Sequence, residues 1–409
     1  MTGKSPAVPD KLQHEANFNL LYARIPNRQF LFYRMNQETK PVSNPFESKI
    51  NSIQVLRAAA ALTVTIYHLK DVIRKDEPFK QELDYFFNSG PSGVALFFVI
   101  SGFIMVYITK HSTFSLRSVY KFMARRFIRI WPTYAIITLI YFVFQSRIGL
   151  QPGAFISLIL SLLFIPVTHT DPPFYGYAFL PVGWTLNYEI YFYALVAISM
   201  FFSRFRWYVF FVIVIITLII LPLTLGYMTL ETQRTADYGN GYLNMIMNPI
   251  IWNFVYGVII GLIYTNEKLF PIFASVFSKV WLVFMFVSLA LWQYWSGFFG
   301  GLGPSQWGLG SSLLFTAFIF YNARRPIQFP DWLVKIGDMS FSVYLVHLPV
   351  VVILGNLFKR LGYPVYSTGT SMFFLSLFMT LVLSYLSYQF LELRLSSYLK
   401  QWLPFMKKR

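Results

Sequence analysis

The most constraining feature of this sequence is a close succession of apolar segments, most of them long enough to cross a lipid bilayer. About 20 helical residues span a hydrocarbon core of ~30 Å. After Asn51, ten such runs follow one another with short connections. They predict an all-α, polytopic membrane helix bundle with about ten transmembrane helices. The approximate runs are 53–72, 91–109, 131–146, 184–202, 207–226, 246–264, 280–297, 308–322, 338–358 and 370–392.

The composition supports a membrane location. Hydrophobic residues make up 56% of the chain and charged residues only 12%, whereas a soluble domain carries about 25% charged residues. A surface with so little charge is compatible with lipid and not with water. A soluble enzyme is therefore excluded.

The absence of cysteine removes several chemistries at once. The chain cannot form a disulfide, a thiolate zinc site, an iron–sulfur cluster or a cysteine-linked acyl intermediate. With only five His and 17 Asp+Glu, we expect no metal site.

Basic residues outnumber acidic ones by 34 to 17 and gather beside hydrophobic runs. Residues 110–129 and 394–409 contain six and five Lys or Arg respectively, and no acidic residue. The positive-inside rule places such segments in the cytoplasm, which favours a topological role over nucleic-acid binding. We expect a polar cytoplasmic N-terminal arm (1–50), a membrane domain (51–393) and a basic cytoplasmic tail (394–409).

An eleventh apolar run, 154–167, is short and is expected not to cross the membrane. With both ends in the cytoplasm the number of crossings is even, and ten crossings follow. The loops 167–183, 227–245 and 297–307 then lie outside and contain a single Lys or Arg, Arg234. If residues 154–167 crossed the membrane, every loop after them would change sides, and the charge pattern expected from the positive-inside rule would be inverted there.

Two ionisable residues lie in the first run. Burying such a group in a membrane helix costs about 2.5–3.5 kcal/mol, so each of these residues is expected to have a structural or functional role. Arg57 and His68 are eleven residues apart, close to one helical face and ~16 Å apart along the axis. A cation there can hold the phosphate end of coenzyme A while the acyl end meets the imidazole. The alternative for Arg57 is a side chain that extends to the membrane interface.

Glu189 lies in the fourth run, and the depth expected from its position matches that of His68. An imidazole and a carboxylate at one depth predict a catalytic base and its orienting acid. A buried structural pair is the alternative interpretation.

His347 shares a helical face with Ser340 and Tyr344. The same depth arithmetic places His347 closer to the cytoplasm than His68. We therefore interpret Tyr344 and His347 as substrate-binding residues that line a channel, with helix–helix hydrogen bonding as an equal alternative.

The stretch RRFIRIWPTY, residues 125–134, enters a helix from the cytoplasmic side. Arg125, Arg126 and Arg129 are candidate phosphate ligands, because guanidinium groups match phosphate oxygens bidentately. Pro132 is compatible with the first turn of that helix. In FFVISGF, Ser101 and Gly102 allow close approach of another helix or of a ligand.

Five segments in this order resemble the acyltransferase 3 family of membrane acyltransferases, from about Ile50 to Arg394. They are INSIQVLRAAAALTVTIYHL, GVALFFVISGFIM, RRFIRIWPTY, GWTLNYEIYFY and GDMSFSVYLVHLP. The resemblance implies that Arg57 and His68 match the family's essential Arg–His pair, and that Arg126 and Arg129 match its basic motif.

The resemblance also implies a function. It predicts a bacterial inner-membrane O-acetyltransferase that moves an acetyl group from cytoplasmic acetyl-CoA to a hydroxyl of a cell-surface or lipid-linked polysaccharide. Arg57, His68 and Glu189 are the predicted catalytic residues. Trp184 and Asn187, in GWTLNYEIYFY, are further candidates for substrate binding. The alternative is a proton-coupled glycan or lipid transporter without acyl transfer.

Overall fold

The computed structural model describes residues 51–112 and 115–403, and all regular elements within them are helical. The predicted N-terminal arm (1–50) and the end of the basic tail (404–409) lie outside the described residues. The α-helices are α3 (Asn51–Leu69), α4 (Lys80–Phe87), α5 (Ser92–Thr109), α6 (Leu116–Ser146), α7 (Ala154–Leu162), α8 (Trp184–Met200), α9 (Arg206–Ile215), α10 (Leu221–Thr224), α11 (Gly241–Ile246), α12 (Trp252–Thr265), α13 (Leu269–Val276), α14 (Val280–Ser296), α15 (Leu309–Arg324), α16 (Asp331–Asp338), α17 (Ser340–Arg360), α18 (Thr370–Ser387) and α19 (Ser396–Gln401). Short 3₁₀ or π segments are η1 (Lys70–Val72), η2 (Pro181–Gly183), η3 (Ser203–Phe205), η4 (Ile216–Ile220), η5 (Pro249–Ile251), η6 (Pro304–Gly308), η7 (Pro364–Ser367) and η8 (Tyr388–Leu395).

Each of the ten predicted runs coincides with helical structure, and the prediction of an all-α protein is confirmed for the described residues. Five helical segments are long and apolar enough to cross a membrane, or six if one bent pair counts as a span. The chain is therefore a multi-pass membrane protein, and ten crossings stay a prediction. The five segments are Lys80–Thr109, Leu116–Ser146, Ser203–Thr224, Ser340–Arg360 and Thr370–Gln401, and the bent pair joins Pro249–Thr265 to Leu269–Val276 at 103°.

The third predicted run begins earlier than expected. α6 has 31 residues and starts at a capping box, in which Ser115 and Ser118 bond each other's backbone N–H groups. The basic stretch 125–134 lies well inside this helix, because Lys and Arg are good helix formers. Pro132 therefore lies inside the helix and not in its first turn, which corrects that expectation. α7, by contrast, has nine residues and extends only ~13.5 Å.

α5 and α12 make the closest helix contact through glycines. A Cβ at Gly102 would overlap the carbonyl oxygen of Phe254, and one at Gly257 would overlap that of Val99. Gly261 follows Gly257 by four residues and packs on Val106. This small-residue spacing lets two backbones touch, as in other membrane helix pairs. The order of the contacts shows that α5 and α12 run parallel.

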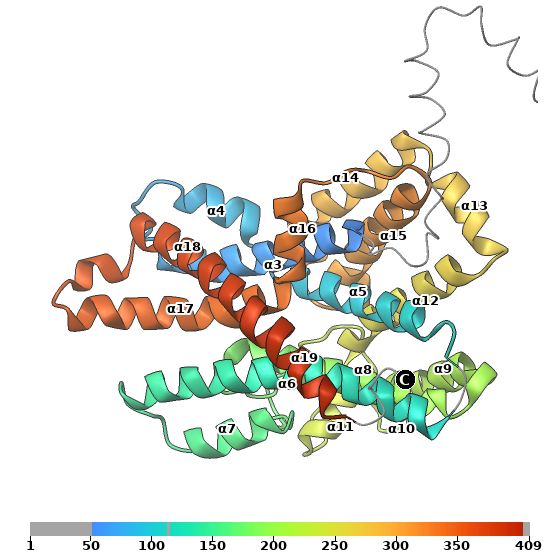
Figure 1. Ribbon diagram of the computed structural model, residues 1–409, viewed down its shortest axis with the longest axis horizontal. Helices are drawn as coiled ribbons and strands as arrows, with labels where there is room; N and C mark the ends of the chain where they lie inside the picture. The colour runs from blue at the N-terminus through green and yellow to red at the C-terminus, as the bar shows by residue number, and fades with distance from the viewer. Residues whose placement is uncertain (1–50, 113–114, 404–409) are drawn as a thin grey trace, which may run out of the picture. The chain divides into compact units, whose positions relative to one another are not determined.

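α3 lies between α5, α16 and α17, and its neighbours fix its direction (Figure 1). Gly93 of α5 packs on the carbonyl of Ala60, while Gly90 packs on Tyr67. The two helices are thus antiparallel. Gly337, at the end of α16, packs on the carbonyl of Gln54. α17 continues from there alongside α3.

The connection between α7 and α8 is packed into the bundle. Tyr175 and Leu180 are 2% and 0% exposed, and the Tyr175 hydroxyl donates to the carbonyl of Asn244 at 2.9 Å. Gly183 packs against the ring of Tyr134, within α6. α8 consequently begins inside the bundle and not at a membrane edge.

Candidate functional site

The site consists of three cavities in the described residues, and we name them by their positions. The mouth cavity, of about 630 Å³, lies between α3, α6 and the C-terminal helices. The waist cavity is narrow, at about 80 Å³. The outer cavity is wide again, at about 850 Å³. Adjacent cavities share lining residues, so the three lie in series.

The mouth cavity is strongly basic. It brings together the predicted phosphate ligands Arg125, Arg126 and Arg129 with Arg57 from α3. Its other described lining residues are Asp338, Tyr388, Glu392, Leu393, Ser396 and Lys400. Five cationic and two acidic side chains form this wall, which suits a polyanion.

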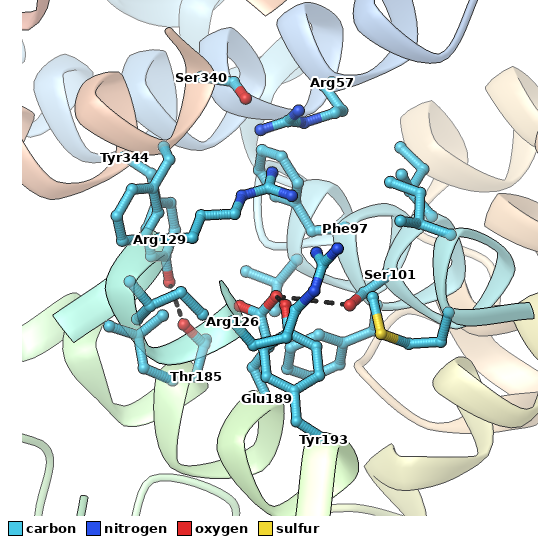
Figure 2. A pocket seen from close by; sticks show the side chains of 18 residues that line it. Arg57, Phe97, Ser101, Arg126, Arg129, Thr185, Glu189, Tyr193, Ser340 and Tyr344 are labelled. Carbon is cyan, nitrogen blue, oxygen red and sulfur yellow. Dashed lines mark hydrogen bonds between the residues drawn. The ribbon is translucent and has the colours of Figure 1, made fainter. Parts of the chain in front are cut away.

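Arg57, Arg126 and Arg129 line the waist cavity (Figure 2), and they also line the mouth cavity. Arg125 lines the mouth alone and is exposed. The buried Nε and Nη1 atoms of Arg126 have no hydrogen-bond partner among the described residues. Its guanidinium lies 5.8 Å from the ring centroid of Tyr193. Buried donors without partners are costly, so these nitrogens are placed to receive an anionic ligand.

Glu189 also lines the waist cavity, with Ser101 and Tyr193. The hydroxyl of Ser101 donates to its Oε1 at 3.4 Å, and that of Tyr193 donates to the same oxygen. The predicted pairing of Glu189 with His68 is therefore wrong, because among the described residues no hydrogen bond joins them and they line different cavities.

The physical reason for this error is the depth of Glu189. Its partner Ser101 lies eight residues along α5 from Gly93, which packs on Ala60. Because α5 and α3 are antiparallel, Ser101 and Glu189 lie toward the Arg57 end of α3, ~12 Å from the level of Ala60. The depth arithmetic assumed that α8 starts at the membrane edge, whereas it starts inside the bundle.

His68 lines the outer cavity and pairs with His347. Nε2 of His347 lies 3.2 Å from Nδ1 of His68, and the ring centroids are 5.1 Å apart. His347 is fully buried. Its predicted position, closer to the cytoplasm than His68, is wrong. Because nitrogens of the two rings are 3.2 Å apart, the two side chains lie at one depth.

Tyr344 separates the waist from the outer cavity, and with Val94 it lines both. Its hydroxyl lies 3.0 Å from that of Thr185 and 3.1 Å from the carbonyl of Val182. These bonds join α17 to the start of α8. Tyr344 is thus placed to control what passes between the two cavities.

The two candidates from GWTLNYEIYFY have different positions. Trp184 lines the outer cavity. Asn187 is buried, and its Oδ1 has no partner among the described residues. It is not among the described lining residues of the three cavities.

Sequence reasoning missed Glu392, which lines the mouth cavity beside the arginines. Its Oε1 accepts a hydrogen bond from the backbone N–H of Ser342 at 3.1 Å, and from the Ser342 hydroxyl. The same rule that selected Glu189 finds it, because Glu392 is an ionisable residue within an apolar run.

The fold and cavities define a multi-pass helical membrane protein with a polar interior and a basic mouth. Residues 50–389 match the profile of the acyltransferase 3 family, described as an acyltransferase domain. The chain belongs to this family, and it is a membrane acyltransferase. It is 29% identical over 284 residues to the exopolysaccharide production protein ExoZ of Rhizobium meliloti (strain 1021), covering 65% of this chain and 78% of the relative. No solved structure matches the chain.

Proposed function

We propose that this acyltransferase is an O-acetyltransferase of a bacterial inner membrane, with acetyl-CoA as donor and a cell-surface or lipid-linked polysaccharide as acceptor. The observation that carries the proposal is the series of three cavities, which leads from a basic mouth through a narrow waist to His68. The similarity to a protein of exopolysaccharide production supports a glycan acceptor.

The donor enters through the mouth. Its phosphates bind Arg57, Arg126 and Arg129, whose guanidinium groups match phosphate oxygens. The slender pantetheine arm then follows the waist. Arg57 and His68 lie ~16 Å apart along α3, so the arm carries the acetyl group toward the outer cavity.

His68 is the base of the reaction. It takes the proton of a sugar hydroxyl as the hydroxyl oxygen bonds to the thioester carbonyl carbon. The carbon–sulfur bond then breaks, the acetyl ester remains on the sugar, and the proton passes to the thiolate of coenzyme A. Atoms and charge balance without a further reactant.

Glu189 has a different role from the one predicted. It lines the waist with the three arginines, so its charge offsets part of theirs. We assign it to the donor side, where it orients Tyr193 and Ser101.

The alternative of a transporter is less well supported. A waist of about 80 Å³ is small compared with the 300–1,000 Å³ of typical ligand pockets, and so does not fit a whole glycan or lipid headgroup. A path with a wide chamber at each end suits an extended donor that reaches through it.

Purified full-length protein in detergent, given labelled acetyl-CoA, tests the proposal. We expect turnover of the donor, and a loss of at least ~10²-fold in kcat for His68→Gln, which keeps the size but not the basicity of the side chain. Arg57→Lys should instead raise the KM for acetyl-CoA, since lysine lacks the bidentate fork. A wild-type protein that does not turn over acetyl-CoA, or a fully active His68→Gln, contradicts the proposal.

A further inference from the structure

The outer cavity differs in charge from the mouth. Its lining contains the carboxylates Asp71, Asp84 and Glu231, while no Lys or Arg is among the described residues that line it. The mouth, in contrast, is lined by four arginines and Lys400. The walls at the two ends of the path therefore differ in their charged groups.

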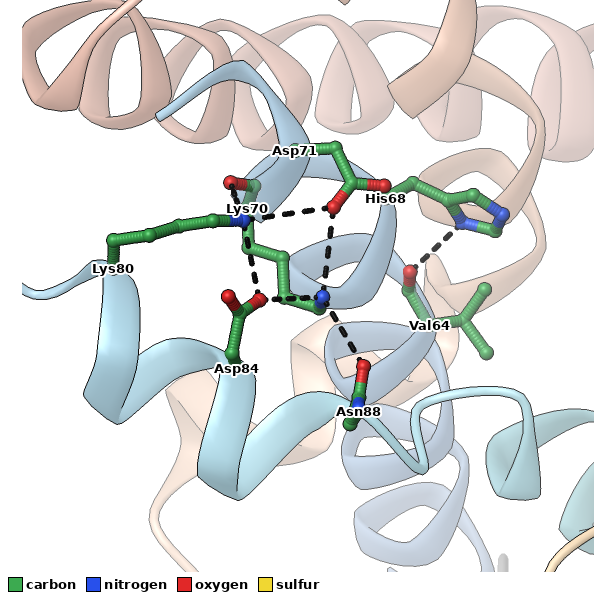
Figure 3. A network of polar contacts seen from close by, with 7 residues as sticks. All are labelled: Val64, His68, Lys70, Asp71, Lys80, Asp84 and Asn88. Carbon is green, nitrogen blue, oxygen red and sulfur yellow. Dashed lines mark hydrogen bonds and ion pairs between the residues drawn. The ribbon is translucent and has the colours of Figure 1, made fainter. Parts of the chain in front are cut away.

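The nearest lysines are already occupied (Figure 3). Lys70 is 4% exposed, and its Nζ donates to Asp84 at 2.7 Å, to Asn88 at 3.4 Å and to Asp71 at 3.5 Å. An ammonium group has three donors, so all three are used. Nζ of Lys80 donates to the carbonyl of Lys70 and to Asp84, both at 3.1 Å.

The carboxylates, by comparison, can still accept hydrogen bonds. The recorded bonds of Asp71 and Asp84 within the described residues use Oδ1. The second oxygen of each remains available to a hydroxyl donor. Glu231 pairs with Arg234 through Oε2 at 3.0 Å. The cavity wall thus offers hydrogen-bond acceptors to a ligand, and the charges of its carboxylates are balanced by Lys and Arg side chains outside the lining.

Aromatic rings form much of the remaining wall. Tyr85, Tyr177 and Trp295 line the cavity and expose 66%, 41% and 46% of their surfaces. Large exposed rings beside hydroxyl acceptors provide an apolar platform with polar edges. A sugar ring has the complementary structure, with C–H faces and a rim of hydroxyl groups.

We propose that the outer cavity binds an uncharged sugar residue of the acceptor and discriminates against uronates and phosphorylated sugars. This inference rests on the proposed acetyl transfer to a glycan, and it names the class of acceptor. An anionic sugar would be desolvated beside carboxylates, without a free cation among the described lining residues to pair with, and this is costly. At about 850 Å³ the cavity falls within the size range of ligand pockets.

Binding is measured without donor, on the purified full-length protein, by intrinsic tryptophan fluorescence. The probes are cellotetraose, which is neutral, and tetragalacturonate, which is anionic. We expect cellotetraose to bind at least ~10-fold more tightly. Trp295→Ala should weaken its binding about 10-fold, whereas Trp292→Ala, an exposed residue of the same helix that does not line the cavity, should not.

A charge substitution tests the electrostatic part. Gln233 is exposed, lines the cavity and has no recorded hydrogen bond among the described residues. Gln233→Lys should therefore improve tetragalacturonate binding several-fold, whereas Gln151→Lys, on another exposed loop, should leave it unchanged.

Turnover of labelled acetyl-CoA, measured in parallel, separates the two hypotheses. If the donor is consumed but tetragalacturonate binds as well as cellotetraose, or neither binds, the inference on the acceptor is overturned and the proposed function stands. If cellotetraose binds selectively but acetyl-CoA is not consumed, the proposed function fails and the sugar site stands.

Discussion

At the scale of single residues, the hydrogen bonds around His68 decide which of its nitrogens would act as the base in the proposed transfer. Nδ1 of His347 lies 3.1 Å from the carbonyl of Val343, and a carbonyl only accepts. Neutral His347 therefore carries its proton on Nδ1 and its lone pair on Nε2. Nδ1 of His68 meets that lone pair and the carbonyl of Val64 at 3.0 Å. It must carry the proton, which leaves Nε2 of His68 as the free base.

His347 is thus a positioning residue, and its substitution tests the assignment. In His347→Gln the amide oxygen still accepts from His68 Nδ1, whereas in His347→Leu nothing replaces the lost acceptor. We expect the leucine variant to lose ~10- to 100-fold in kcat, as for other groups that orient a functional histidine, with an unchanged KM for acetyl-CoA. The glutamine variant should recover most of this loss. Equal losses in both variants would assign His347 to packing alone.

At the scale of helices, the sequence predicted the positions of the helices along the chain well. It predicted the depth of individual side chains within the membrane less well. Apolar length alone predicted all ten runs. The depth of Glu189 was wrong because it depends on the preceding connection, which enters the bundle through Tyr175 and Leu180. A long connection of polar, proline and aromatic residues carries no periodic signal of such packing. The sequence predicted the contact of α5 with α12 only in part: Gly102 was a candidate for close helix approach, whereas its partners Gly257 and Gly261 were not predicted.

The start of α18 is held by a carboxylate from another segment. Glu77 accepts hydrogen bonds from the backbone N–H and hydroxyl of Thr370, the first residue of α18, and pairs with Arg74. Partial burial alone would raise the pKa of Glu77, but these partners lower it below its ordinary 4.5. A negative charge there also favours a helix N-terminus.

The lowered pKa of Glu77 has a consequence for stability against pH. The ionised group stabilises the fold above pH 4.5, and this contribution is lost as the pH falls through the lower folded-state pKa. Glu77→Gln should therefore lower the Tm at pH 7, with Glu267→Gln, an exposed carboxylate, as control. The difference between wild type and Glu77→Gln should disappear as the pH falls below the folded-state pKa of Glu77. A difference that persists there would assign the effect to lost hydrogen-bond geometry.

At the scale of the whole membrane domain, the charges and cavities agree on a direction. The three loops predicted to lie outside all contribute to the outer cavity, through Tyr177, Glu231 and Gly300 among others. On the side predicted to be cytoplasmic, Arg206 donates to the carbonyls of Thr109 and Ser112. The parallel pair α5 and α12 and the antiparallel pair α3 and α5 also fit the predicted alternation of crossings. In the proposed transfer, a donor from inside and an acceptor from outside would then meet near His68, and the acetyl group would cross the bilayer without coenzyme A.

This direction rests on the ten-crossing topology, in which α7 does not span. Because the chain contains no cysteine, single cysteines introduced at exposed positions report the side of the membrane without background. Thr170 lies in the connection after α7 and Ser203 in the one after α8, and both are exposed. In intact cells, Thr170→Cys should react with an impermeant maleimide, and Ser203→Cys should react only after permeabilisation. The reverse pattern would place the basic mouth outside, where acetyl-CoA is absent, and the transfer across the membrane would have to be abandoned.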